Sequence, residues 1–110
     1  MNTELQKALI SMGYRQPNKN EKPNIWMKPV GFHLFQVDVD TQTWTNWFMG
    51  PRSGELTMWT SKTLSDNFNV HGDYEVQIQS IEGYSRMDIQ GGGNFAFLTR
   101  EEQIAMYLSF

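Results

Sequence analysis

Hydrophobic and polar positions divide the chain into a helical segment, a run of strands and a second helical segment. The first segment has an apolar stripe at helical spacing, formed by Leu5, Ala8, Leu9 and Met12. Thr3 is expected to cap this helix, with Gln6 completing a capping box. Gly13 then stands where a left-handed residue ends a helix. The pattern therefore predicts a short N-terminal helix.

Residues 15–24 contain no large apolar side chain but hold two prolines and three asparagines, which predicts an exposed loop. From Ile25 the chain turns apolar, and Pro29 limits that stretch to an edge strand or to the end of a strand.

Period-two alternation predicts a β-meander in the middle of the chain. Strands are expected at 32–40, 43–49 and 55–60, joined by turns at 40–42 and 50–54. One face of the first of these strands carries His33, Phe35, Val37 and Val39. In the third strand, Leu56 and Met58 are expected to face one way and Trp59 the other.

Residues 61–73 are polar and irregular, and residues 74–78 then alternate between apolar and polar side chains, which predicts another strand. Further strands are expected at 84–89 and 95–98, with a glycine-rich loop at 91–94. A capping box at 99–102 predicts a final helix. The expected fold class is α+β: one domain over residues 1–110, with an antiparallel five- to six-stranded meander sheet and one short helix at each chain end.

Composition fits a globular protein, with 39% hydrophobic and 19% charged residues in a chain of 110. No apolar run approaches the roughly 18–20 residues that cross a bilayer, and no signal-peptide pattern follows the start. The absence of cysteine excludes disulfides, thiolate metal sites and cysteine nucleophiles. A cytoplasmic location is expected.

Charge is distributed unevenly. Residues 1–30 carry a net charge of +3, whereas residues 31–110 carry −6. The basic segment is interpreted either as a solvated loop or as an arm that contacts an anionic partner, which includes the acidic body of a second copy.

Aromatic side chains gather in the middle of the sequence, at Trp26, Phe32, Phe35, Trp44, Trp47, Phe48 and Trp59. Trp44 and Trp47 lie an odd number of residues apart, so a regular strand points them to opposite faces. At least one tryptophan is then covered by a helix, left exposed or held by a partner.

Catalytic and metal-binding patterns are weak. There is no Gly-x-Ser-x-Gly motif, and Gly91–Gly93 are expected to precede a strand rather than the helix that a phosphate loop requires. The candidate ligands Asp38, Asp40, His33, His71 and Asp73 show no recognised metal-site spacing. Aspartates beside a hairpin turn explain Asp38 and Asp40 equally well. No enzyme, metal or cofactor is expected.

The sequence thus predicts a non-catalytic protein that binds a protein partner, as an inhibitor, an immunity factor or a phage or mobile-element accessory protein. The expected anchors are Trp44, Trp47 and Trp59, with Asp38 and Asp40 steering a basic partner surface. An exposed sheet edge near Pro29 also makes a homodimer plausible.

Two other hypotheses remain open. Single strands of nucleic acid would stack on the same aromatics, with their phosphates held by Arg15, Lys19, Lys22 and Lys28. This ranks lower because residues 32–49 contain no Lys or Arg. A small ligand between the sheet and a terminal helix would instead stabilise the protein thermally.

Overall fold

Four antiparallel strands in the order β1-β2-β3-β4 form the sheet of the protein. The structure is a computed structural model that describes residues 2–49 and 56–91. The elements in chain order are α1 (Thr3–Ser11), β1 (Ile25–Val30), β2 (His33–Asp38), β3 (Thr43–Met49), β4 (Leu56–Thr63), α2 (Phe68–His71) and α3 (Tyr74–Gly91). The α+β class and the antiparallel meander are therefore confirmed.

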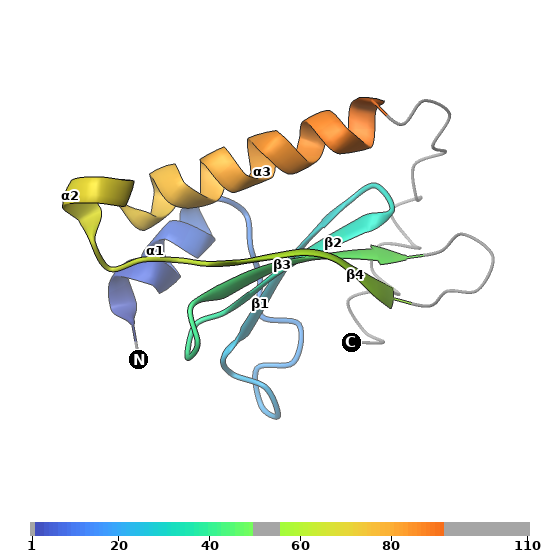
Figure 1. Cartoon of the computed structure of the whole chain (residues 1–110). Helices are drawn as coiled ribbons and strands as arrows, with labels where there is room; N and C mark the ends of the chain where they lie inside the picture. Colours follow the sequence, from blue (N-terminus) through green and yellow to red (C-terminus); the bar gives the residue numbers. More distant parts are fainter. Residues whose placement is uncertain (1, 50–55, 92–110) are drawn as a thin grey trace.

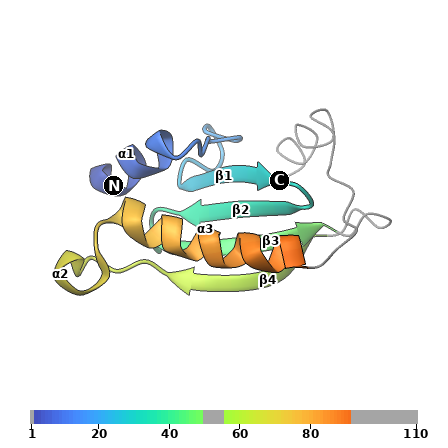
Figure 2. The same ribbon diagram turned by 90° about the horizontal axis from the view of Figure 1, so that it is seen from above.

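The helices α1 and α3 lie on one face of the sheet, and α3 runs lengthwise over it, roughly along the strands (Figure 1; Figure 2). The main core fills the space between these layers. It joins Leu5 and Leu9 of α1 and Ile78 of α3 to Phe35 and Trp44 of the sheet. A smaller cluster around Met27 and Leu34 lies on the opposite face. None of the described helices is both long and apolar enough to span a membrane.

The N-terminal helix is confirmed, with one correction at its start. The helix is capped by Asn2 rather than by Thr3: the Asn2 side-chain oxygen accepts a hydrogen bond from the backbone N–H of Leu5 at 3.1 Å. The Leu5 side chain is completely buried. Asn2 is a stronger cap than Thr3 would be because its amide oxygen reaches the free N–H groups of the first turn. Gly13 ends the helix with φ +88°, as its position predicts.

The strands of the meander fall close to their predicted positions. β1 is an edge strand that contains Pro29, in agreement with the prediction, and its neighbour β2 buries His33, Phe35 and Val37 on the helix-covered face. The turn at 39–42 places Gln42 at φ +55°. Between β3 and β4 the register shifts at Asn46/Trp47, which inserts Trp59 as an extra residue in β4.

Residues 74–78 and 84–89 are not strands: both lie in α3. The alternation that predicted a strand is coincidental, since Val76 is 49% exposed while Tyr74 and Ile78 are buried. The buried positions Tyr74, Ile78 and Glu82 recur every four residues, which is helical spacing. Asp73 begins the helix by accepting the N–H of Val76 at 2.8 Å. The described residues therefore form four strands rather than five or six.

Three other predictions fall outside the described residues. These are the turn at 50–54, the strand at 95–98 and the helix at 99–110. The glycine loop predicted at 91–94 also lies there, except for Gly91, which is the last residue of α3.

Helical packing of α3 predicts unequal effects from two neighbouring substitutions. Ile78→Ala should lower the free energy of unfolding by about 2–4 kcal/mol because it leaves a cavity in the core. Val76→Ala should change it by less than about 0.5 kcal/mol, since that side chain faces solvent. Urea denaturation of both variants measures the difference. Equal losses would contradict the helix and restore the strand, in which both residues share a face.

Candidate binding surface

A buried polar network holds α3 on the sheet. Glu82 of α3 is 5% exposed, and Lys28 of β1 lies 3.2 Å from both of its carboxylate oxygens. The Tyr14 hydroxyl donates to Glu82 at 2.6 Å and accepts the indole N–H of Trp44 at 3.1 Å. The Lys28 ammonium also lies 5.4 Å from the centre of the Tyr14 ring. Because the buried carboxylate has a cation and a hydroxyl partner, its burial is tolerated.

Two of the predicted site residues, Trp44 and Lys28, belong to this network. Trp44 is completely buried, so it is a core residue and is not available to a partner at the surface. Lys28 is committed to Glu82 and is half-buried, which leaves little of its charge for a phosphate. The helix α3, whose residues the sequence pattern assigns to strands, covers this face of the sheet and contributes Glu82 to the network.

Trp47 points to the face opposite Trp44, as their spacing predicts. It packs beside Met27 and Leu34 in the smaller cluster, and its indole N–H donates to the Gln36 side-chain oxygen at 3.0 Å. Trp47 is therefore a half-buried part of that face rather than a free anchor.

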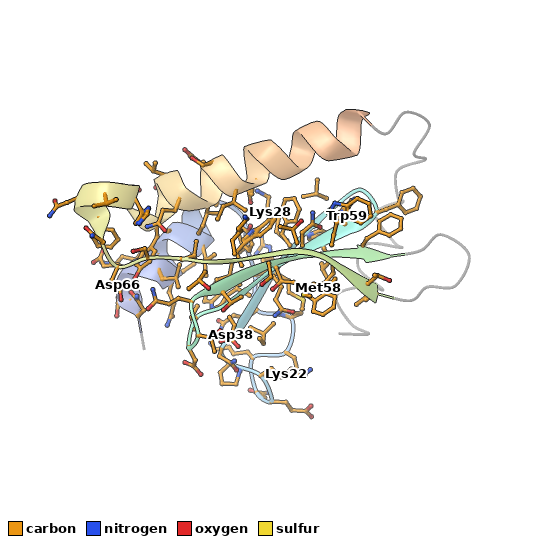
Figure 3. The ribbon with its side chains drawn as sticks, viewed as in Figure 1. Lys22, Lys28, Asp38, Met58, Trp59 and Asp66 are labelled. Atoms are coloured by element: carbon orange, nitrogen blue, oxygen red, sulfur yellow. The ribbon has the colours of Figure 1, made fainter. Side chains whose placement is uncertain are left out.

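Trp59 is the predicted anchor that remains accessible, with 54% of its surface exposed. The bulge in β4 turns its ring toward the helix-covered face, where it meets His33 edge-on at 5.8 Å and Phe48 at 5.6 Å between ring centres. Met58 pairs with Trp47, and thus lies on the opposite face, where it is 60% exposed. Opposite facing of Met58 and Trp59 is confirmed (Figure 3).

The outer side of β4 is an open edge within the part of the chain that the structure describes. β4 pairs with β3 alone over its eight residues, and it contains no proline and one charged side chain, Lys62. Open edges of this kind accept another strand. At the other edge of the sheet, Arg15 exchanges two backbone hydrogen bonds with Met27 of β1. The sequence pattern identified the edge near Pro29 but not the β4 edge, because strand order depends on which segments pair and not on a local pattern.

His33 packs against the rings of Phe48 and Trp59. It is buried, and its Nδ1 donates to the Asn46 side-chain oxygen at 2.7 Å, since that oxygen can only accept. Burial lowers the pKa of His33 below its ordinary value of 6.5, and the hydrogen bond to Asn46 opposes this effect. The imidazole is accordingly neutral near pH 7.

The two predicted steering aspartates have different roles. Asp38 accepts hydrogen bonds from the backbone N–H groups of Asp40 and Thr41 and from the Asn24 side chain, at 3.0, 3.3 and 3.1 Å. It therefore organises the β2–β3 turn, as surface aspartates beside a turn often do. Asp40 is exposed. This turn lies at the Thr63 end of β4, because Thr43 pairs with Thr63.

Arg15, Lys19 and Lys22 are exposed on the predicted loop, which the structure confirms as an irregular segment before β1. They lie at the β1 side of the sheet, whereas Trp59 lies on β4. Three strand spacings, roughly 14 Å, separate the two edges. The structure therefore does not bring the basic residues and Trp59 together.

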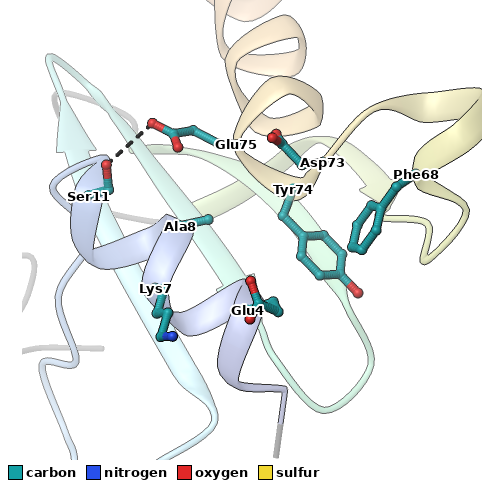
Figure 4. A pocket seen from close by; sticks show the side chains of 8 residues that line it. All are labelled: Glu4, Lys7, Ala8, Ser11, Phe68, Asp73, Tyr74 and Glu75. Carbon is teal, nitrogen blue, oxygen red and sulfur yellow. Dashed lines mark hydrogen bonds between the residues drawn. The ribbon is translucent and has the colours of Figure 1, made fainter.

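A mixed groove of about 490 Å³ lies between α1 and the start of α3 (Figure 4). Its lining includes the carboxylates Glu4, Asp73 and Glu75 together with Lys7, and Ser11 donates to Glu75 at 3.3 Å. Asp73 is engaged in capping α3. These carboxylates serve the helix ends, so the groove has no assembled chemistry of its own.

Tyr74, which lines this groove, forms hydrogen bonds with three of the described residues through its hydroxyl. It donates to Asp66 and accepts from Asn2 at 2.7 Å and from Gln42 at 2.8 Å. The hydrogen bonds from Tyr74 and Gln42 lower the pKa of Asp66, and burial together with Asp66 raises the pKa of Tyr74. The network joins both helices to the β2–β3 turn.

Among residues 2–49 and 56–91, no group of three or more His, Asp or Glu side chains is placed to hold a metal ion. His33 lies on β2, whereas His71 lies in α2, and the structure does not bring them together as ligands. Comparison with known proteins adds no family: no family model, curated protein or solved structure matches this chain.

Removal of the Lys28 charge should destabilise the fold, because it leaves the buried Glu82 carboxylate without its cation. Lys28→Met should lower the free energy of unfolding by about 2–3 kcal/mol, below the full range for buried pairs because the Lys28 side chain is 20% exposed. The double variant Lys28→Met/Glu82→Gln should recover most of this loss, since it leaves no buried charge. Chemical denaturation of the single and double variants measures both values. A loss below about 0.5 kcal/mol in the single variant would contradict this role for the pair.

Acid should destabilise the fold through His33. The unfolded state takes up a proton near pH 6.5, whereas the folded state binds it only at a lower pH, so stability falls as the pH decreases through 6.5. His33→Gln should flatten the dependence between pH 7 and 5, and His71→Gln serves as the control. Asp66 contributes only at more acidic pH, because its pKa lies below 3.8. An unchanged slope in the His33 variant, measured by urea denaturation, would contradict this assignment.

Proposed function

We propose that this protein is a non-catalytic binding module that engages a protein partner through the outer edge of β4. One observation carries the proposal: β4 is open on its outer side among the described residues and exposes Met58 and Trp59 on opposite faces. A strand added to this edge would gain backbone hydrogen bonds, and its side chains would meet an apolar neighbour on each face. Large exposed side chains of this kind dominate binding energies.

Charge favours a protein partner over nucleic acid. The open strand carries only Lys62, and the loop cations lie at the other edge of the sheet. Affinity for nucleic acid depends mainly on cations that contact phosphates, and β4 itself supplies one, Lys62. Asp40 and Asp66 lie toward the Thr63 end of β4 and would steer a basic partner segment. An inhibitor, an immunity factor or a phage or mobile-element accessory protein would each use such a module.

The bulge at Trp59 gives the edge its specificity. A bulge interrupts regular pairing and discourages indiscriminate association of edge strands, as does a lysine on the strand. A partner must therefore accommodate the extra residue and seat the indole ring. This requirement separates recognition from simple aggregation through an exposed strand.

Affinity capture with the tagged protein from source-cell lysate, with and without nuclease, tests the proposal. The wild type should retain a stoichiometric protein that survives nuclease, and Met58→Ser/Trp59→Ala should lose it because both anchors are removed. Val70→Ser/Val76→Ser is the matched control, since these side chains are 69% and 49% exposed elsewhere on the surface. The control should bind as the wild type does.

Two outcomes would contradict the proposal. One is recovery of nucleic acid alone, abolished by nuclease and falling steeply with salt, which would favour the nucleic-acid hypothesis. The other is undiminished capture by the Met58/Trp59 variant, which would move the binding surface away from β4. A band with the mass of this chain itself would identify the partner as a second copy.

A further inference from the structure

We propose a second binding site, independent of β4, in which a small pocket beside β1 takes an organic anion with an apolar body. The pocket has a volume of about 420 Å³ and lies where the end of α1 meets the loop that leads to β1. Its apolar wall is formed by Ile10, Tyr14 and Trp26. Arg15 and Lys19 also line it, and both are exposed.

The described residues that line this pocket carry charge of one sign. Two of them are cations, and none of them is Asp or Glu. The groove between α1 and α3 differs in this respect, because carboxylates and a lysine share it. A ligand with a carboxylate or phosphate group would gain from both cations, whereas a cation would be repelled.

Trp26 supplies an independent observation. The residue is 5% exposed, and its indole N–H has no hydrogen-bond partner in the part of the chain that the structure describes. A buried donor without an acceptor is costly, and most such donors in folded proteins are satisfied. Because the N–H is itself fully buried, a ligand acceptor would relieve this cost by shifting the Trp26 ring and uncovering the N–H.

The backbone around Arg15 is fixed before any ligand binds. Its N–H donates to the Met27 carbonyl at 2.8 Å, and its carbonyl accepts the Met27 N–H at 2.7 Å. The Gln16 side chain in turn donates to the Pro23 carbonyl at 2.8 Å, which closes the loop on itself. The site therefore begins from a fixed main chain, and a ligand has to order only the side chains of the two cations.

Burial of the Tyr14 and Trp26 rings argues against binding of single-stranded nucleic acid at this pocket. Tyr14 and Trp26 are 2% and 5% exposed, so they leave no open ring faces on which successive bases could stack. The proposed ligand is a small molecule that carries one carboxylate or phosphate group on an aryl or alkyl body. A nucleic-acid strand is the competing outcome of the test.

Nuclear magnetic resonance on the full ¹⁵N-labelled chain tests the site directly. The indole N–H resonance of Trp26, assigned with Trp26→Phe, should shift saturably when benzoate or phenyl phosphate is added. Benzyl alcohol is the uncharged control and should cause no saturable shift. Arg15→Gln/Lys19→Gln should weaken binding by about tenfold or more, because it removes both charges. Lys7→Gln/Lys62→Gln, which removes two exposed cations elsewhere, should leave the affinity unchanged.

Several results would overturn the proposal. The Trp26 resonance could fail to move with either anion, or move equally with benzyl alcohol. Equal binding by the Arg15/Lys19 variant and the control variant would show that the pocket cations are not used. Binding of oligothymidylate that leaves the Trp26 resonance unchanged, when neither small anion shifts it, would assign the basic loop to nucleic acid instead. Failure of the β4 capture experiment would not affect any of these readouts.

Discussion

Placement of α3 depends on the burial of Glu82. A carboxylate that is 5% exposed requires compensation, and Lys28 and Tyr14 provide it from β1 and from the segment after α1. The same tyrosine accepts the indole N–H of Trp44, so one carboxylate connects helix, sheet and loop. Apolar contacts around Ile78 supply the bulk of the packing, and the polar network selects the position of the helix on the sheet.

With α3 in this position, the two faces and two edges of the sheet become different surfaces. The helix-covered face buries Phe35 and Trp44, while the opposite face keeps the smaller cluster around Met27 and Leu34. The β1 edge is partly paired through Arg15. The β4 edge is open among the described residues and carries the exposed side chains of Met58 and Trp59. The binding proposal follows from this asymmetry.

Local features were predictable from the sequence. The stripe of α1, the left-handed Gly13, the strand 43–49 and the opposite facing of Trp44 and Trp47 all depend on near neighbours in the chain, whose spacing determines them.

Features that depend on distant contacts were not predictable. Tyr74, Val76 and Ile78 alternate like a strand, but the buried position of Glu82 that completes the helical pattern is a charged residue, which sequence reasoning assigns to the surface. Its partner Lys28 lies 54 residues earlier in the chain, so no local pattern reveals the pair. For the same reason Trp44 was expected at a binding surface and lies instead in the core.

The most direct test of the account is amide hydrogen exchange across β4, with and without the protein partner recovered by capture. A strand added to the outer edge would hydrogen-bond those β4 amides that point away from β3, which alternate along the strand. The account predicts slower exchange in the complex at the outward-pointing amides of Leu56–Thr63, which alternate on each side of the bulge at Trp59, and little change in residues 15–24. Unchanged exchange in β4, with protection confined to residues 15–24, would contradict it.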